Sequence, residues 1–258
     1  MLLTIDLGNT NITMGAYEGD RILFVSRLAT DKAKTKDQYA VELNSIFGLY
    51  GLPPNGFRGA IIGSVVPELT MEMCEAVETV TGKKPVLLGP GTKTGLNILT
   101  DNPAHVGADL VAGAVAAAAK YPLPCLVVDL GTATKISVVD KSGSFTGCTI
   151  SAGVAISLDA LARRASQLPN ISLTAPPRVI GKNTVDSMQS GTVYGTAAMI
   201  DGLCARIEDE LGMKAGTVVA TGGLSRDIVK NCRREILFNA ELVLEGLKII
   251  YEKNSKTK

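Results

Sequence analysis

The chain has 258 residues, of which 46% are hydrophobic and 20% are charged. This balance is typical of a folded protein with a substantial core, and it excludes an intrinsically disordered chain. The formal net charge is +1 and there is no tryptophan. Neither the charge nor the aromatic content therefore favours nucleic acid or an anionic membrane surface as a partner.

Cysteine usage and the apolar stretches bear on where the protein works. The five cysteines are scattered, and none forms a Cys-x-x-Cys pair, so we expect free thiols rather than a disulfide framework or a structural zinc site. The N-terminus leads directly into a strand pattern, so we expect no signal peptide. The longest apolar stretch, residues 111–119, is too short to cross a bilayer. These features predict a cytoplasmic protein.

The first half of the chain predicts strands that alternate with helices. An apolar run ends at Asp6-Leu7-Gly8, and apolar residues recur at helical spacing over residues 37–50. A continuous apolar run at residues 61–66 is typical of a buried parallel strand, and Pro67 suits the first turn of a helix. Further strands are predicted at residues 12–17, 22–27 and 84–88.

The second half repeats this pattern after a linking helix at residues 108–120. Strands are predicted at residues 125–129, 136–139, 145–150 and 217–220, and helices at residues 156–164, 184–211 and about 240–251. We therefore predict an α/β protein with two similar lobes, residues 1–110 and 111–258, and a cleft between the lobes. The last helix is a candidate to pack back on the first lobe.

Two strand ends, far apart in the sequence, have the same Asp-Leu-Gly pattern followed by small polar residues. The first reads Asp6-Leu7-Gly8-Asn9-Thr10, and the second reads Asp129-Leu130-Gly131-Thr132-Ala133-Thr134. A carboxylate at the tip of a buried strand can order a cation or its waters, and a glycine turn lets backbone N–H groups approach phosphate oxygens. One copy alone is equally compatible with an ordinary hairpin turn. The second copy favours a duplicated nucleotide-binding architecture.

Other polar positions each allow a structural and a functional interpretation. Thr221-Gly222-Gly223 directly follows an apolar run, so it is either a tight turn or a contact for the adenosine of a nucleotide. Asp109 opens the linking helix, either as a stabilising first-turn acid or as a general base for a substrate hydroxyl. Thr184 is either the N-cap of the long helix or a contact to a polar substrate. His105 is the only histidine, so no histidine metal cluster can form.

Several blocks in this order are more specific than any single glycine turn. They are Asp6 to Thr10, Ser64-Val65-Val66-Pro67, Gly107-Ala108-Asp109, Asp129 to Thr134, and residues 156–161, 177–184 and 221–223. In these blocks the chain resembles the type III pantothenate kinases, which have the duplicated actin-like (ribonuclease H-like) ATPase fold. The resemblance covers nearly the whole chain.

The resemblance implies ATP-dependent phosphorylation of pantothenate, the first step of coenzyme A biosynthesis. It also implies a homodimer that needs Mg²⁺ and a monovalent cation, K⁺ or NH₄⁺. On the matching positions, Asp109 would accept the proton of the pantothenate hydroxyl, Asp129 would bind the monovalent cation, and Asp6 would hold Mg²⁺ directly or through water. The predicted nucleotide contacts are Asp6, Leu7, Gly8, Asn9, Thr10, Asn11, Ile12, Thr13, Thr132, Gly222 and Gly223. The predicted pantothenate contacts are Thr100, Gly107, Ala108, Asp109, Leu110 and Thr184, with Thr184 expected to reach a pocket shared across the dimer interface.

The chain departs from the family at two of the pantothenate contacts. Leu110 stands where the family usually has arginine, and Thr100 stands where many members have tyrosine. Losing a guanidinium removes a charge-assisted hydrogen bond to a carboxylate, worth about 1.5–3 kcal/mol. Two alternatives therefore stay open: a related kinase for another small hydroxyl compound, and a non-enzymatic ATP-binding regulator.

Overall fold

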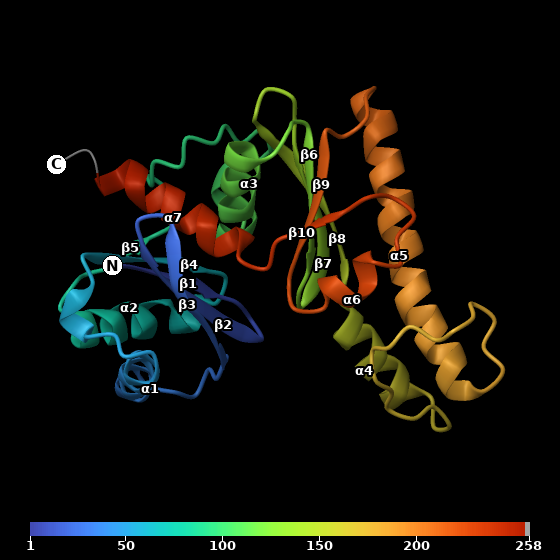
Figure 1. Ribbon diagram of the computed structural model, residues 1–258, viewed down its shortest axis with the longest axis horizontal. Coiled ribbons are helices and arrows are strands. Elements are labelled where there is room, and N and C mark those ends of the chain that lie inside the picture. Colours follow the sequence, from blue (N-terminus) through green and yellow to red (C-terminus); the bar gives the residue numbers. More distant parts are fainter. Residues whose placement is uncertain (256–258) are drawn as a thin grey trace. The chain divides into compact units, whose positions relative to one another are not determined.

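Each half of the repeated sequence pattern forms a five-stranded sheet with helices packed on it in the computed structural model, which describes residues 1–255 (Figure 1). The chain divides into two units. The first unit contains residues 1–96, 101–116 and the segment from Leu242, and the second contains residues 97–100 and 117–241. The predicted α/β class is confirmed.

The sheet of the first unit has the strand order β3-β2-β1-β4-β5. Its strands are β1 (Leu2–Leu7), β2 (Asn11–Glu18), β3 (Arg21–Ala29), β4 (Gly59–Ser64) and β5 (Val86–Leu87). β1 is antiparallel to β2 and parallel to β4, so it is buried between the opening hairpin and a crossover strand. This position explains why the apolar run of β1 is nearly continuous.

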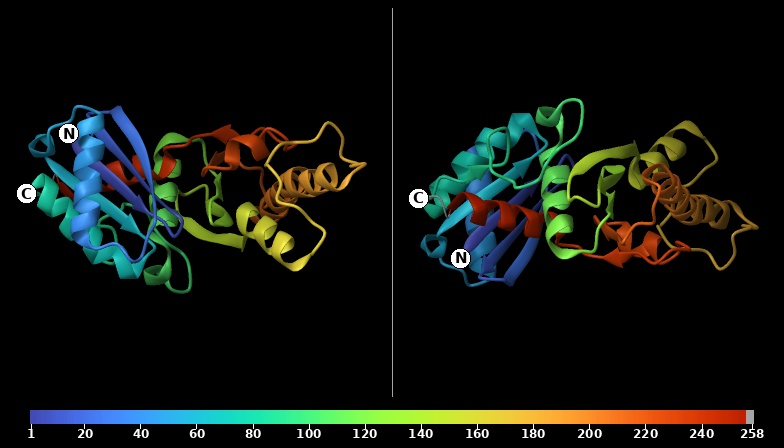
Figure 2. Two further views of the ribbon diagram at one scale, coloured as in Figure 1. Left: turned by 90° about the horizontal axis from the view of Figure 1, so that it is seen from below. Right: turned by 90° about the horizontal axis from the view of Figure 1, so that it is seen from above.

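Helices cover both faces of this first sheet (Figure 2). Leu3, Ile5 and Leu7 belong to the core that the sheet forms with α1 (Lys36–Leu49) and α2 (Pro67–Thr81). Successive side chains of a strand point to opposite faces. Asp6 therefore lies on the other face, which α7 (Leu242–Ser255) covers through its contacts with β1 and β4.

The sheet of the second unit repeats the first. Its order, β8-β7-β6-β9-β10, matches β3-β2-β1-β4-β5 strand for strand, and β6 is likewise antiparallel to one neighbour and parallel to the other. The strands are β6 (Cys125–Leu130), β7 (Ala133–Val139), β8 (Phe145–Ala152), β9 (Thr217–Thr221) and β10 (Leu237–Phe238). The duplication predicted from the two Asp-Leu-Gly strand ends is therefore present in the fold.

The helices of the second unit pack on one side of its sheet through an apolar core. Leu126, Val128 and Leu130 of β6 pack with residues of α5, which leaves Asp129 on the opposite face by strand alternation. The helices are α4 (Val154–Arg164), α5 (Thr184–Leu211) and α6 (Ser225–Val229), and α3 (Ala108–Lys120) runs from the first unit into the second. Two single 3₁₀ turns lie in the first unit, at Pro54–Gly56 and Pro103–His105.

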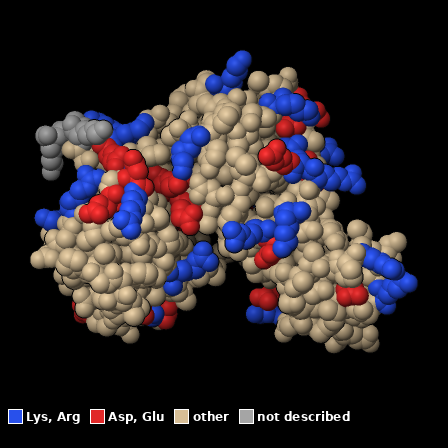
Figure 3. Space-filling model, viewed as in Figure 1, with Lys and Arg blue, Asp and Glu red and all other residues tan. Residues whose placement is uncertain are grey.

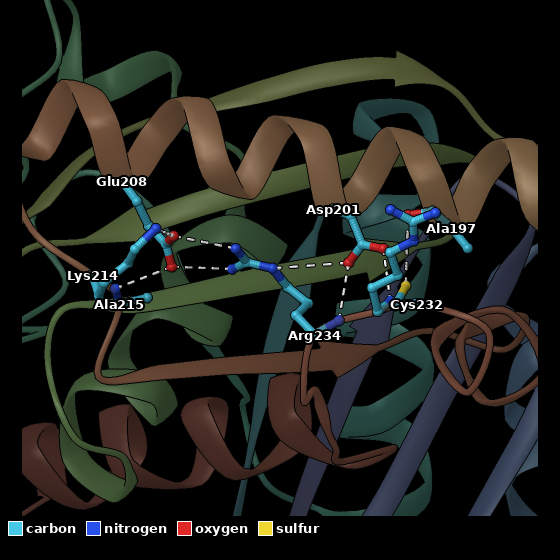
Figure 4. Close-up of polar contacts among 8 residues, drawn as sticks. Ala197, Asp201, Glu208, Lys214, Ala215, Cys232 and Arg234 are labelled. Carbon is cyan, nitrogen blue, oxygen red and sulfur yellow. Dashed lines mark hydrogen bonds and ion pairs between the residues drawn. The ribbon is translucent and has the colours of Figure 1, made fainter.

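A buried charge cluster fixes α5 to the chain segments on either side of β9 (Figure 4). The Glu208 side chain is only 6% exposed, and both of its oxygens accept hydrogen bonds of 3.2 Å from the Arg234 guanidinium. Lys214 Nζ donates to Glu208 Oε2 at 2.9 Å, and the Ala215 amide donates to Oε1 at 3.2 Å. Every lone pair of the carboxylate therefore faces a donor, which offsets the cost of its burial.

The surface carries charged side chains of both signs. The face shown in Figure 3 carries both acidic and basic side chains, and several of the acidic ones gather in one patch at the upper left. All five cysteines lie within the described residues, and none of them forms a disulfide there. Across residues 1–255, no helix combines the length and the apolar character needed to cross a membrane.

The predicted elements differ from the observed ones mainly at short segments. β5 is only Val86–Leu87 rather than residues 84–88, and α4 begins at Val154 rather than residue 156. The short elements α6 and β10 were not predicted, because two to five residues carry too little periodicity to be recognised. The long helix was predicted with the bounds that it has, residues 184–211.

Candidate active site

The turn after β1 is tight and holds its polar side chains at the edge of the first sheet. The Gly8 amide donates to the Asn11 carbonyl at 3.0 Å, and the Thr30 hydroxyl donates to the Gly8 carbonyl at 2.6 Å. A Cβ on Gly8 would lie 2.9 Å from the Asn11 oxygen, so only glycine fits this closure. Asn9, Thr10 and Asn11 are exposed there. Their donors can therefore reach a ligand at this edge.

The turn after β6 has the same construction. The Gly131 amide donates to the Ala133 carbonyl at 3.1 Å. Gly222, after the parallel strand β9, has φ +96°, and a Cβ there would lie 2.9 Å from Asp129 Oδ1. The structure thus brings Asp129, Gly131 and Gly222 together at one edge of the second sheet.

Asp109 lies at the corresponding edge of the first sheet. Gly63 of β4 is the parallel neighbour of Asp6, and a Cβ on Gly63 would lie 3.6 Å from the Ala108 side chain at the start of α3. The first turn of α3 is therefore near the strand that carries Asp6. Asp109 Oδ1 accepts the Leu110 amide at 2.8 Å, and a Cβ on Gly107 would lie 2.6 Å from that oxygen. A side chain at position 107 would therefore displace the carboxylate from this position.

Two further predicted contacts, Thr100 and Thr184, lie in the second unit, and of the two interpretations of Thr184 the N-cap is wrong. Thr184 is the first residue of α5, but the N-cap is Asn183, whose side-chain oxygen accepts the Asp186 amide at 2.9 Å. Thr184 is exposed and is free of the capping role. The Thr100 hydroxyl is buried with no hydrogen-bond partner among the described residues.

Comparison with known proteins identifies the family. A model of the type III pantothenate kinase family matches residues 2–206. The chain belongs to the type III pantothenate kinase family. A type III pantothenate kinase of Exiguobacterium sp. is 43% identical over 256 residues, covering 99% of this chain and 100% of that protein. One from Shouchella clausii is 46% identical over 258 residues, covering 98% of this chain and all of that protein.

Solved structures support the fold at low sequence identity. The ROK hexokinase of Thermus thermophilus superposes with a TM-score of 0.53 at 16% identity, covering 99% of both chains. Component A of the (R)-2-hydroxyglutaryl-CoA dehydratase of Acidaminococcus fermentans gives a TM-score of 0.59 at 14% identity, covering 98% of both chains. The fold is therefore the duplicated one of the actin-like ATPases and sugar kinases, as predicted.

One feature of this family member was not found from the sequence: a cavity of about 840 Å³ that α4, α5 and the preceding loop line within the second unit. Thr184 and Lys182 line it, and no acidic residue is among its lining residues. Thr134, which is 2% exposed, also lines it, and its hydroxyl has no hydrogen-bond partner among the described residues. The cavity suits a ligand with an anionic group and hydroxyl or amide groups. The sequence signal was weak, because only the fold brings Thr134 beside α5.

A second feature was also missed. Lys135 of β7 is the cross-strand neighbour of Asp129, and its Nζ lies 2.7 Å from Asp129 Oδ2. The two side chains are 14% and 20% exposed. Sequence reasoning started the second strand at residue 136, so it did not place Lys135 in the ladder. The carboxylate expected to bind a free cation is already paired with an ammonium group of the chain itself.

Proposed function

We propose that this member of the family transfers the γ-phosphate of ATP to the hydroxyl of pantothenate, giving 4'-phosphopantothenate for coenzyme A biosynthesis. The observation that carries the proposal is the repeated strand end, Asp6 to Thr10 and Asp129 to Thr134, each closed by a glycine turn. Family membership over residues 2–206 supports the choice of pantothenate as the acceptor. The free cysteines are in keeping with an enzyme of the reducing cytoplasm.

The first turn supplies the main contacts for the phosphates. Exposed Asn9, Thr10 and Asn11 offer side-chain donors, and the turn places backbone N–H groups beside them. Among the described residues, no group of three or more His, Cys, Asp and Glu side chains could hold a metal. Mg²⁺ is usually bound through one or two carboxylates together with substrate phosphates, and Asp6 at the end of β1 is the carboxylate that we assign to it. When bound, Mg²⁺ neutralises the charge of the phosphates.

The second turn holds the rest of the nucleotide. Thr132 offers its hydroxyl to the phosphates, and Gly222 and Gly223 let the adenosine lie close to the backbone. The steric limit at Gly222 supports this assignment, since a side chain there would meet the Leu130 carbonyl at 2.6 Å. ATP contacts at residues Asp6 to Thr13, Thr132, Gly222 and Gly223 remain predictions.

Asp109 acts as the base for the acceptor. It lies in the first turn of α3, with its carboxylate beside Gly107. Taking the proton from the attacking hydroxyl adds about 10²–10⁴-fold to the rate. Most of the remaining acceleration comes from positioning and from stabilisation of the developing charge.

The acceptor contacts are Thr100, Gly107, Ala108, Leu110 and Thr184. Leu110 cannot bind the carboxylate of pantothenate as an arginine would, so another cation must do so or the affinity falls. Lys182 is the cation beside Thr184 on the cavity wall, and it makes no ion pair with any residue that the structure describes. It is therefore our candidate for that contact. We assign the protein as a homodimer, in which Thr184 reaches a pocket shared between the two copies.

The test of this function is ADP formation with ATP and Mg²⁺, measured with pantothenate and with a panel of small hydroxy acids and sugars. We expect pantothenate to give the highest kcat/KM and 4'-phosphopantothenate as the product. Faster turnover of another acceptor would show that Thr100 and Leu110 have changed the substrate. No ADP with any acceptor, despite ATP binding, would instead indicate a nucleotide-binding regulator.

A further inference from the structure

Lys135 and Asp129 form a pair that the geometry of the β6–β7 hairpin imposes. They are directly opposite in the antiparallel register, so their side chains share one face of the sheet. That face is the one opposite α5, at the edge where Gly131 and Gly222 close on Asp129. The ammonium group is thus held at 2.7 Å from the carboxylate by the fold itself, in a site where both side chains are largely shielded from water.

A free monovalent cation does not fit this carboxylate as it stands. K⁺ and NH₄⁺ each bring one positive charge to oxygen ligands, and the Lys135 ammonium already brings one positive charge to Oδ2 of this carboxylate. A second cation at Asp129 would be repelled by the first at close range, with little water between them to screen the repulsion. The Asp129 site of this chain therefore does not fit the monovalent cation that the family resemblance implies.

We propose that Lys135 replaces the monovalent cation in this chain, so that its ammonium group neutralises Asp129 and phosphoryl transfer requires neither K⁺ nor NH₄⁺. Lys135 is a positioning residue: it holds the Asp129 carboxylate and, through it, the turn at Gly131 and Thr132. The proposal rests on the proposed kinase function for its activity readout, and its binding readout is independent of that function.

The competing interpretation is a salt bridge that only stabilises the hairpin. Removal of the lysine would then lower the melting temperature and have no specific dependence on small cations. If Lys135 instead takes the place of the free cation, its removal should make the enzyme depend specifically on small cations. When a smaller side chain replaces Lys135 and leaves space, a free cation should bind at Asp129 and restore the lost activity.

The experiment compares the wild-type enzyme with Lys135→Thr and Lys135→Met in tetramethylammonium buffer. Threonine suits a strand and leaves room for an ion, whereas methionine keeps most of the volume of lysine without its charge. Lys141→Thr is the matched control, because Lys141 is exposed in the turn that follows β7. Steady-state ADP formation is titrated with KCl and NH₄Cl, and ion binding is followed separately by ²⁰⁵Tl NMR with Tl⁺ as the K⁺ probe.

For the wild type and Lys141→Thr, we expect full activity without K⁺ and no saturable Tl⁺ signal. Lys135→Thr should lose about tenfold or more of its activity without K⁺, as for loss of one charge-assisted interaction, and should regain it with K⁺ or NH₄⁺. The same variant should show saturable Tl⁺ binding. Lys135→Met should lose activity without rescue, because its side chain occupies the ion position.

Strong activation of the wild type by K⁺, or saturable Tl⁺ binding to it, would overturn the proposal. So would a Lys135→Thr variant that is fully active without K⁺, or one that is destabilised and gains no Tl⁺ site. If no protein formed ADP with any acceptor, the kinase assignment would fail. The Tl⁺ comparison of wild type and Lys135→Thr would still decide whether the lysine stands in for the ion.

Discussion

Asp109 is the single residue on which the proposed chemistry depends most directly. Its carboxylate lies in the first turn of α3 and accepts the Leu110 amide at 2.8 Å through Oδ1. Asparagine keeps the shape of the side chain and its acceptor oxygen but cannot take a proton. We predict that Asp109→Asn lowers kcat by about 10²–10⁴-fold and leaves the Kd for ATP within a factor of about two.

That comparison needs kcat from ADP release and the ATP Kd from calorimetry on the same preparation. A purely structural first-turn acid would give a different result, because asparagine supports a helix start nearly as well as aspartate. Near-normal kcat in Asp109→Asn would therefore assign the residue to the helix and remove it from the chemistry.

At the level of elements, the Glu208 cluster determines how α5 responds to acid. Burial alone would raise the pKa of Glu208, but the hydrogen bonds from Arg234, Lys214 and the Ala215 amide outweigh burial and lower it to about 2. The ordinary value is 4.5. A group with a lowered folded pKa stabilises the fold above its unfolded pKa, and this contribution is lost as the pH falls from about 4.5 to about 2.

We predict that Glu208→Gln lowers the free energy of unfolding by roughly 2–3 kcal/mol at pH 7, because Arg234 loses its charged partner. The deficit should shrink as the pH falls below 4.5, since the wild type then loses the same contribution. Urea unfolding at pH 7, 4 and 3 measures both effects. Asp227→Asn is the matched control: the Asp227–Lys230 pair is 62% and 60% exposed and should contribute little. An unchanged deficit at pH 3 would contradict the account.

The sequence alone predicts the type of the longer elements but not the contacts between them. The apolar run at residues 61–66 predicted a strand that the structure places at Gly59–Ser64, and the long helix was predicted at its observed bounds, 184–211. Contacts that depend on strand register, or on segments far apart in the sequence, cannot be predicted from such local patterns. Lys135 faces Asp129 only when β7 begins at Ala133, and Arg234 reaches Glu208 across 26 residues of sequence. Thr184 was one candidate for the N-cap because threonine caps helices well, but Asn183 has the side chain that reaches Asp186.

For the candidate site, the repeated turns were predictable because their glycines and carboxylates are adjacent in the sequence. The structure adds the reasons why those glycines are needed: the Gly8–Asn11 closure and the approach of Gly222 to Asp129. The cavity beside Thr184 was not predictable, because it is formed by residues from β7, β8, α4 and α5 together. Thr134 was considered for the nucleotide turn, yet its hydroxyl belongs to the cavity lining.

At the scale of the whole molecule, the homodimer that we propose predicts how variants at Asp109 and Thr184 behave when they are mixed. Asp109→Asn and Thr184→Val should each be nearly inactive as separate proteins if one copy supplies the base and the other supplies Thr184. Mixing the two variants under conditions of subunit exchange should restore up to about a quarter of wild-type activity, because mixed dimers contain one intact site. Sedimentation checks that dimers form. Absence of recovery in exchanged dimers would place both residues of a site in the same copy.

The central claim is that the two repeated strand ends bind one nucleotide. It is tested most directly by a crystal structure of the full chain with Mg²⁺ and a non-hydrolysable ATP analogue. We predict phosphate oxygens within hydrogen-bonding distance of the Gly8–Asn11 turn and of Thr132, with Mg²⁺ bound by Asp6 directly or through one water. A triphosphate that contacts neither turn, or only one of them, would contradict the account.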